Sequence, residues 1–183
     1  MSQFTGLPEY GQGLEIKNRL VQKLRGIDIS PTGYAVYLWN LHPIYQMLEG
    51  ISRNYDIFDE APELRRAGRI YEDFYEVWPY VDRTPPILPA VNRYLDRLME
   101  IKDDYNLVLA HIYIQHISGL HTSQDVAELV PGRKLFYQYP DNIAELDRKV
   151  YSKITRPAFD EAVLSFELSR QLFKEVLANN RLL

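Results

Sequence analysis

AHIYIQHISGLHTSQDV, residues 110–126, is the stretch on which the interpretation of this chain depends. It begins with apolar and aromatic residues at helical spacing and changes midway into the small and polar residues Ser118-Gly119 and Thr122-Ser123. A helix that loses side-chain bulk in its middle allows another group to lie close to its backbone. By itself the pattern is compatible with a close helix–helix contact, with a fraying helix end, or with a surface that a bound group lies against.

The same stretch carries three of the four histidines in the chain, His111, His116 and His121. At about 100° per helical residue, histidines five positions apart point roughly 140° apart, so they cannot form one metal-binding face. The Glu-x-x-His unit of di-iron bundles is absent from the sequence. Since the chain also has no cysteine, disulfides and thiolate metal sites are excluded.

Composition places the chain among ordinary globular proteins, with 46% hydrophobic and 25% charged residues in a length of 183 that favours one domain. The net charge of -4 argues against nucleic acid or an anionic membrane as the main partner. No apolar run approaches the roughly 20 residues of a membrane span, and no secretory signal is visible at residues 1–8. We therefore expect a cytoplasmic protein.

Apolar residues recur at helical spacing along most of the chain, and no stretch alternates as a strand would. Ser30 followed by Pro31 predicts the capped start of a long helix, which Pro43 is expected to kink. In the helix around residues 91–98, Arg93, Asp96 and Arg97 are expected mostly on the solvent side. The predicted architecture is an all-α bundle with an irregular arm at 1–13 and a helical domain at 14–183, whose helices are expected at 14–24, 31–52, 61–77, 91–98, 104 onward, 142–153 and 156–179.

The order of these segments resembles the heme oxygenase family from about Asn18 to Val176. The similarity is carried by a family helix of the form Leu-Tyr-His-Ile-Tyr-x-x-Leu-Glu, by the opening of the family's distal helix, and by its terminal helix. The matching stretches here are Gly33-Tyr34 through Leu41-His42-Pro43-Ile44-Tyr45-Gln46-Met47-Leu48-Glu49, Pro62-Glu63-Leu64-Arg65-Arg66, Pro89-Ala90-Val91-Asn92-Arg93-Tyr94, Leu109-Ala110-His111-Ile112-Tyr113, and Ala162 through Phe166 to Gln171-Leu172-Phe173-Lys174-Glu175.

The resemblance implies a heme clamped between a proximal helix near the N-terminus and a kinked distal helix. In the family a proximal His binds the iron, and an electron donor such as ferredoxin or a reductase supplies electrons. Bound oxygen then opens the ring to biliverdin, carbon monoxide and iron, with a distal Asp anchoring the water that delivers protons. The cofactor supplies this chemistry, and the protein supplies the ligand, the orientation and the proton path.

The iron ligand departs from the family pattern, because the first 41 residues contain no His. Extension from the Gly33 helix places Gln12 at the ligand position, with Tyr10 and Glu15 as the nearest side chains able to reach iron. Tyr10, or His121 from the distal side, is therefore the candidate axial ligand.

The distal motif also departs, because Gly-Asp-Leu-Ser-Gly-Gly-Gln is replaced by Ser-Gly-Leu-His-Thr-Ser-Gln at residues 118–124. Gly119 stands where the family has its Asp, and Ser118, Thr122 and Ser123 replace three glycines. Tyr45, Ser118 and Thr122 are the candidates for holding distal water. The residues implied to contact heme are Gly119, Ser123, Arg148, Lys153 (next to Ser152, which replaces an Arg) and Phe166.

Two functions follow from this comparison of residues. The first is heme binding, with oxidative opening of heme to biliverdin, carbon monoxide and iron. The alternative is a non-catalytic protein on the same scaffold that binds another flat apolar ligand or a protein partner, since a fold does not imply one function. The hydroxyls that replace the distal Asp are poor proton donors, so slower or altered chemistry is expected. Relatives with metal or quinone-type sites find no support in the His and Glu spacing.

Overall fold

The computed structural model describes residues 29–59, 61–118, 125–155 and 157–179, and within these ranges the chain is helical and contains no strand. The all-α prediction is confirmed. The predicted arm at 1–13 and helix at 14–24 lie outside the described residues. The α-helices and the π-helical segment η5 are α2 (Pro31–Ser52), α3 (Ala67–Val77), α4 (Pro89–Ile101), α5 (Tyr105–Ile112), η5 (Tyr113–Ile117), α7 (Ile143–Tyr151) and α8 (Pro157–Asn179).

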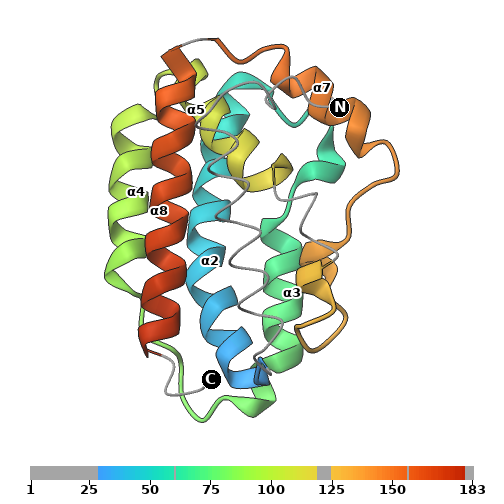
Figure 1. Ribbon diagram of the computed structural model, residues 1–183, viewed down its shortest axis with the longest axis vertical. Coiled ribbons are helices and arrows are strands. Elements are labelled where there is room, and N and C mark those ends of the chain that lie inside the picture. Colours follow the sequence, from blue (N-terminus) through green and yellow to red (C-terminus); the bar gives the residue numbers. More distant parts are fainter. Residues whose placement is uncertain (1–28, 60, 119–124, 156, 180–183) are drawn as a thin grey trace.

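Helix α2 lies in the centre of the bundle, beside α3 and in contact with α4, α5 and α8 (Figure 1). Its start is as predicted, because the Ser30 hydroxyl accepts the backbone N–H of Gly33 at 3.1 Å and Pro31 is the first helical residue. The helix continues through Pro43, whose missing N–H leaves the Trp39 carbonyl without its usual helical donor.

The prediction of a single helix over residues 61–77 is wrong. Pro62–Leu64 forms a 3₁₀ turn, η3, and the chain is extended at Arg65 before α3 begins at Ala67. The reason is a side chain from α2. The Glu49 carboxylate oxygen Oε1 accepts the backbone N–H groups of Arg66 at 2.5 Å and Ala67 at 2.8 Å. Two donors at the start of α3 are thereby satisfied from a distant part of the sequence.

Short elements and caps complete the chain between the long helices. Helix α5 begins where the sequence predicted, and Asp104 caps it by accepting the backbone N–H groups of Asn106 and Leu107. Asn142 precedes α7 without a side-chain capping bond. The segments between the helices contain three 3₁₀ turns, namely η2 (Arg53–Tyr55), η4 (Trp78–Tyr80) and η6 (Leu135–Tyr137). The Asp73 carboxylate on α3 holds η6 by accepting the N–H groups of Leu135 and Phe136.

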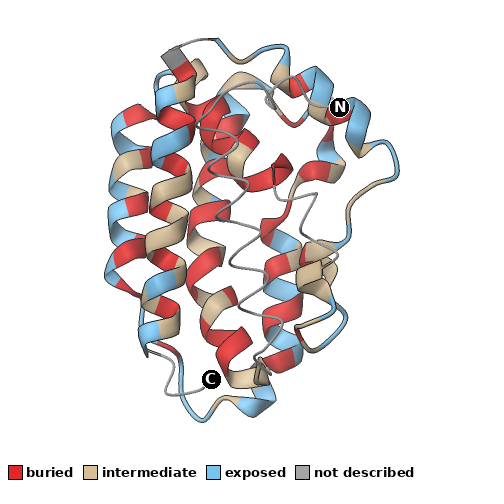
Figure 2. Ribbon diagram, viewed as in Figure 1, coloured by how far each residue is buried: buried red, intermediate tan, exposed pale blue. Residues whose placement is uncertain are grey.

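Buried residues gather on the inner faces of the helices, and exposed residues lie on the outside (Figure 2). The predicted apolar face of α2 is buried, and the aromatic Tyr94 and Tyr113 are also fully enclosed. Tertiary burial of such faces, more than helix propensity, keeps helices of this length folded. This core includes Tyr34, Leu38, Leu41, Tyr45, Leu48, Phe58, Ile70, Phe74, Val91, Tyr94, Leu98, Leu109, Ile112, Tyr113, Ile117 and Leu172.

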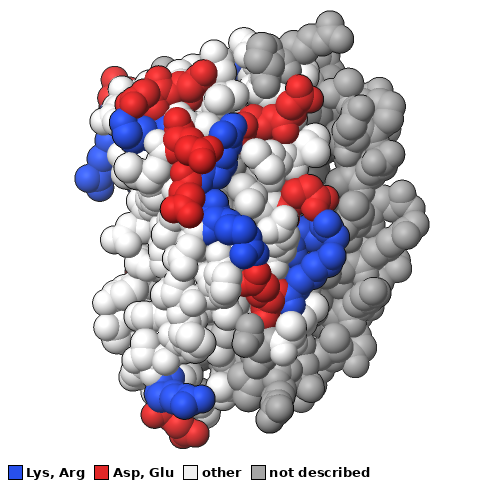
Figure 3. Space-filling model, turned by 90° about the vertical axis from the view of Figure 1, so that its left-hand side faces the viewer, with Lys and Arg blue, Asp and Glu red and all other residues white. Residues whose placement is uncertain are grey.

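Helices α4 and α8 run side by side (Figure 1), and ion pairs join them. Arg93 pairs with Glu175, and Arg97 pairs with Glu161. Seen from this side, basic and acidic side chains are interspersed and form no single-sign patch on the described surface (Figure 3). Among the described helices none is long and apolar enough to cross a membrane.

Candidate functional site

The stretch that the sequence singled out contains a π-helical turn. Helix α5 widens at η5, where the backbone N–H of Ser118 donates to the carbonyl of Tyr113, five residues earlier, at 2.9 Å. The Ser118 hydroxyl donates to the Ile114 carbonyl at 2.7 Å. Single π turns inside α-helices occur often at functional sites, because the extra residue changes which groups face a ligand. We call Tyr113–Ser118 the distal turn.

Tyr45 on α2 fastens the distal turn to the centre of the bundle. Its hydroxyl donates to the carbonyl of Gln115 at 2.6 Å, and its side chain is buried. The Tyr45 ring packs against the ring of His116 at 4.7 Å and that of Phe136 at 5.5 Å. Burial raises the pKa of Tyr45 well above its usual value, so the phenol keeps its proton and remains a donor.

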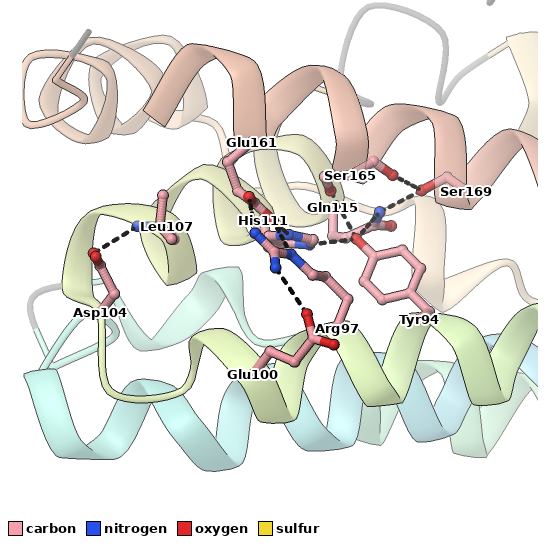
Figure 4. Close-up of polar contacts among 10 residues, drawn as sticks. All are labelled: Tyr94, Arg97, Glu100, Asp104, Leu107, His111, Gln115, Glu161, Ser165 and Ser169. Atoms are coloured by element: carbon pink, nitrogen blue, oxygen red, sulfur yellow. Dashed lines mark hydrogen bonds and ion pairs between the residues drawn. The ribbon is translucent and has the colours of Figure 1, made fainter. Parts of the chain in front are cut away.

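Behind the distal turn, Gln115 enters a buried polar network with α4 and α8 (Figure 4). Its amide nitrogen donates to the Tyr94 hydroxyl at 2.9 Å and to the Ser169 hydroxyl at 2.5 Å. Ser169 in turn donates to the carbonyl of Ser165, and the Ser165 hydroxyl lies 2.7 Å from that of Tyr94. Every one of these polar groups has a partner, so the network holds the turn in one arrangement.

The network continues through His111 to Glu161 and Arg97. The Tyr94 hydroxyl lies 2.9 Å from His111 Nδ1, and His111 Nε2 lies 2.7 Å from Glu161 Oε1. Burial lowers the pKa of His111, which favours the neutral ring with Nε2–H donated to Glu161 and Nδ1 accepting from Tyr94.

Glu161 stays ionised at the end of this chain of hydrogen bonds. Burial opposes its charge, but hydrogen bonds from His111 and Arg97 outweigh burial and hold the pKa of Glu161 at about 2. Arg97 donates Nε to Oε1 at 3.0 Å and Nη2 to Oε2 at 2.6 Å, and its Nη1 donates to Glu100 at 2.8 Å. Figure 4 shows the paired guanidinium and carboxylate between α4 and α8. We call Tyr94, Arg97, His111, Gln115, Glu161, Ser165 and Ser169 the closed network.

His116 points to the opposite side from His111, as the five-residue spacing predicted. Its Nε2 lies 3.3 Å from Glu49 Oε1 on α2, and its ring packs against Phe58 at 5.0 Å. Burial lowers the pKa of His116 as well, so the ring is neutral at pH 7. In the described ranges, no cluster of three or more His, Cys, Asp or Glu side chains can hold a metal ion.

The residues predicted to contact heme are only partly described. Arg148 is exposed on α7, with Nε donating to the Ala144 carbonyl, and Lys153 is exposed just after that helix. Phe166 is half-buried on α8. The remaining candidates lie outside the described residues: Tyr10, Gly119, His121, Thr122 and Ser123. The structure thus brings Tyr45 against the turn that contains Ser118 and leaves the two cationic candidates exposed to solvent.

The closed network was missed from the sequence, although some signals were present. His111 was considered only as a metal ligand, and Arg97 was expected mostly in solvent. A glutamine inside an apolar helix, and serines four residues apart on the apolar side of α8, indicate a buried polar contact. Which residues pair could not be inferred, since Gln115 and Ser169 are 54 positions apart.

Comparison with known proteins supports the fold at the level of structure. No protein-family model matches the chain, and no curated protein matches it. Heme oxygenase-1 of the cyanobacterium Synechocystis, solved with heme, superposes with a TM-score of 0.72 at 19% identity, covering 92% of this chain and 90% of that one. The heme oxygenase of Leptospira interrogans has a TM-score of 0.70 at 17% identity over 90% and 96% of the two chains.

A third solved structure agrees with these two. Synechocystis heme oxygenase-2, solved with heme and NO, has a TM-score of 0.67 at 21% identity over 84% of this chain and 74% of that one. The chain therefore belongs to the all-α proteins with the heme oxygenase fold. The resemblance found in the sequence is confirmed for the fold.

Proposed function

We propose that this protein binds heme against the distal turn. The observation that carries the proposal is the likeness of 92% of the chain to a heme oxygenase solved with heme, in a chain whose corresponding helix widens into a π turn ending at small Ser118. Tyr45 and the closed network hold that turn in place without help from a ligand. A rigid, pre-formed wall lowers the ordering cost of binding a flat ligand.

Three described residues are of the kinds that a heme requires. Phe166, half-buried on α8, offers an apolar contact, and the exposed cations Arg148 and Lys153 suit the propionate carboxylates at the solvent edge. Tyr10 and His121 remain the candidates for the iron ligand. When bound, heme supplies oxygen binding and redox chemistry, and the chain supplies orientation and exclusion of water.

Oxidative opening of heme to biliverdin, carbon monoxide and iron is the second part of the proposal, with a ferredoxin or reductase as electron donor. The hydroxyls of Tyr45 and Ser118 both donate to backbone carbonyls, so toward a distal water they act as acceptors. No carboxylate stands at Gly119 to supply a proton. Slow turnover follows, because positioned acids contribute about 10²–10⁴-fold to such steps.

A hemin titration followed at the Soret band tests the binding proposal. We expect a saturable shift at micromolar hemin with one heme per chain. Ser118→Leu, which adds bulk at the distal turn, should weaken binding about tenfold or more. Thr84→Leu, an exposed substitution in the loop before α4, is the matched control and should bind as the wild type does. No saturable shift would overturn heme binding.

Turnover is tested on the loaded protein by adding a reductant and oxygen and measuring biliverdin. Slow biliverdin formation supports the enzyme. A Soret shift without biliverdin would instead support the alternative, a heme-binding or ligand-binding protein that has kept the fold and lost the reaction. That alternative is favoured because the hydroxyls of Tyr45 and Ser118 already donate to backbone carbonyls.

A further inference from the structure

Two tyrosines on the surface of α3 hold their rings and their hydroxyls together. Tyr71 and Tyr75 are four positions apart, and residues at this spacing are neighbours on a helix surface. The Tyr71 hydroxyl donates to the Tyr75 hydroxyl at 2.9 Å. The ring centres lie 4.6 Å apart at an interplanar angle of 67°, near the lower end of the roughly 4.5–7 Å range of aromatic pairs. Because the oxygens are closer than the ring centres, the rings converge at their hydroxyl ends.

The pair is accessible to solvent and is held in orientation by its neighbours. Tyr71 is 45% exposed, and Tyr75 is 54% exposed. The Tyr71 ring packs against the His42 ring of α2 at 5.4 Å, and the Tyr75 ring packs against Phe74 at 6.0 Å. Phe74 is itself buried. A small solute therefore reaches two phenols that already face each other.

Exposure and mutual contact are not combined in this way by other tyrosines. In the described ranges, no second pair of tyrosines shares a hydroxyl–hydroxyl hydrogen bond. Tyr80 is more exposed, at 64%, but within the same ranges no ring contact joins it to another aromatic side chain. The rings of Tyr55 and Tyr105 lie 5.6 Å apart, but the Tyr55 hydroxyl donates to the Lys102 carbonyl instead. The hydrogen-bonded Tyr45 is buried.

We propose that Tyr71 and Tyr75 are a site of oxidative modification, at which a one-electron oxidant derived from hydrogen peroxide joins the two rings as dityrosine. Each phenol gives one electron to the oxidant and one proton to water. The two phenoxyl radicals then form a carbon–carbon bond between the ring carbons next to the hydroxyls. The hydrogens on those two carbons move to the oxygens, which restores both hydroxyls. The product has lost two electrons and two protons.

The arrangement of the pair is close to that of the product. In dityrosine the two hydroxyls flank the new bond within hydrogen-bonding distance and the rings are twisted, as Tyr71 and Tyr75 already are. Reactants held in contact couple without a bimolecular encounter. The hydrogen bond to Tyr75 raises the pKa of Tyr71, so this phenol is protonated at pH 7 and loses its proton together with the electron. The link stays within one turn of α3.

Oxidation of the ligand-free wild-type chain by hydrogen peroxide and an added peroxidase tests the proposal. We expect dityrosine fluorescence in a chain that remains monomeric on a denaturing gel, with a yield per chain that does not change with protein concentration. The tryptic fragment 70–83, bounded by Arg69 and Arg83, should be lighter by two hydrogens. An unchanged mass of this fragment, or fluorescence confined to cross-linked dimers, would overturn the proposal.

Conservative variants locate the link. Tyr71→Phe and Tyr75→Phe each keep the exposed ring and remove one phenol, so each should lower the dityrosine fluorescence of the monomer about tenfold or more. Tyr80→Phe removes a more exposed phenol from the same tryptic fragment and is the matched control, which keeps the wild-type yield. A wild-type yield in Tyr71→Phe, or a loss of yield in Tyr80→Phe, would contradict the proposal.

The two proposals fail separately, because the oxidant is added from outside and the chain is tested without heme. A chain that forms dityrosine but gives no Soret shift with hemin would disprove the proposed function alone. A chain that binds hemin and keeps fragment 70–83 unchanged under peroxide and peroxidase would disprove the tyrosine cross-link alone.

Discussion

The two sides of the bundle solve the problem of buried charge differently. Between α4 and α8, Arg97, Glu161 and His111 complete one another, and each polar atom of the closed network that faces the core has a partner. Between α2 and α3, Glu49 accepts the backbone N–H of Arg66 and lies beside His116, but within the described residues the buried Arg66 Nε and Nη2 have no hydrogen-bond partner.

The two regions differ in how their buried polar groups affect stability. A polar network in which every group is satisfied gains rigidity from the low dielectric of its surroundings. A cluster with unpaired buried donors has the same desolvation cost without the compensating bonds. The closed network therefore supports the distal turn, whereas the Arg66 cluster contributes less to stability.

The largest effect is expected for Glu161→Gln, which disrupts the closed network. It removes the negative charge and replaces one of the two acceptor oxygens with an NH2 donor, at a site where Glu161 is 6% exposed. We expect the free energy of unfolding to fall by about 3 kcal/mol, as found for the removal of one partner from buried ion pairs. Urea unfolding measures it. Glu100→Gln, at a side chain 64% exposed, is the control and should cost less than about 1 kcal/mol. Equal losses would show that the network is not closed.

A pH titration of stability compares the two histidines. Burial lowers the pKa of both His111 and His116 from 6.5, so the unfolded chain takes up protons at a higher pH than the folded chain does. The contribution of the two neutral histidines to the free energy of unfolding is therefore fully present above pH 6.5 and is lost as the pH drops below it. Between pH 7.5 and 5.5 we expect a loss of about 2 kcal/mol in urea unfolding.

Single variants divide that loss between the two regions. His111→Gln and His116→Gln should each reduce the pH dependence. The pKa of half-buried His42 is lowered as well, and His42 remains in both variants as a constant contribution. A stability that stays flat or rises toward pH 5.5 would contradict the assignment of two neutral buried rings.

The smallest expected effect is that of Arg66→Met. The variant loses the bond to the Gln138 carbonyl, worth about 1 kcal/mol, and also removes an unpaired buried charge. These changes oppose each other, so we expect the free energy of unfolding, measured with urea, to change by less than about 1 kcal/mol. Arg97→Met, which strands Glu161, should cost clearly more. Similar losses in the two variants would mean that the Arg66 guanidinium is already satisfied.

Several elements were predictable because their signals are local. Ser30 and Pro31 mark the start of α2, Asp104 marks that of α5, and the apolar spacing of α2 identifies the face that is buried. The resemblance also picked out Tyr45 and the stretch that becomes the distal turn. The division of the expected 61–77 helix was not predictable, because it depends on Glu49 reaching across from α2. Arg97 was likewise predicted mostly in solvent, although it pairs with the carboxylate of Glu161 on α8.

Local sequence signals were sufficient to predict the helical class, the order of the helices and the small residues in the middle of residues 110–126, because helical period, caps and residue size act over a few neighbouring positions. The tertiary structure alone decided the polar partners. Arg97 and Glu161 are 64 positions apart, and Tyr45 and Gln115 are 70 apart. Packing brings such groups together, and because the same packing excludes water, the paired guanidinium of Arg97 is stabilising and the unpaired nitrogens of Arg66 are costly.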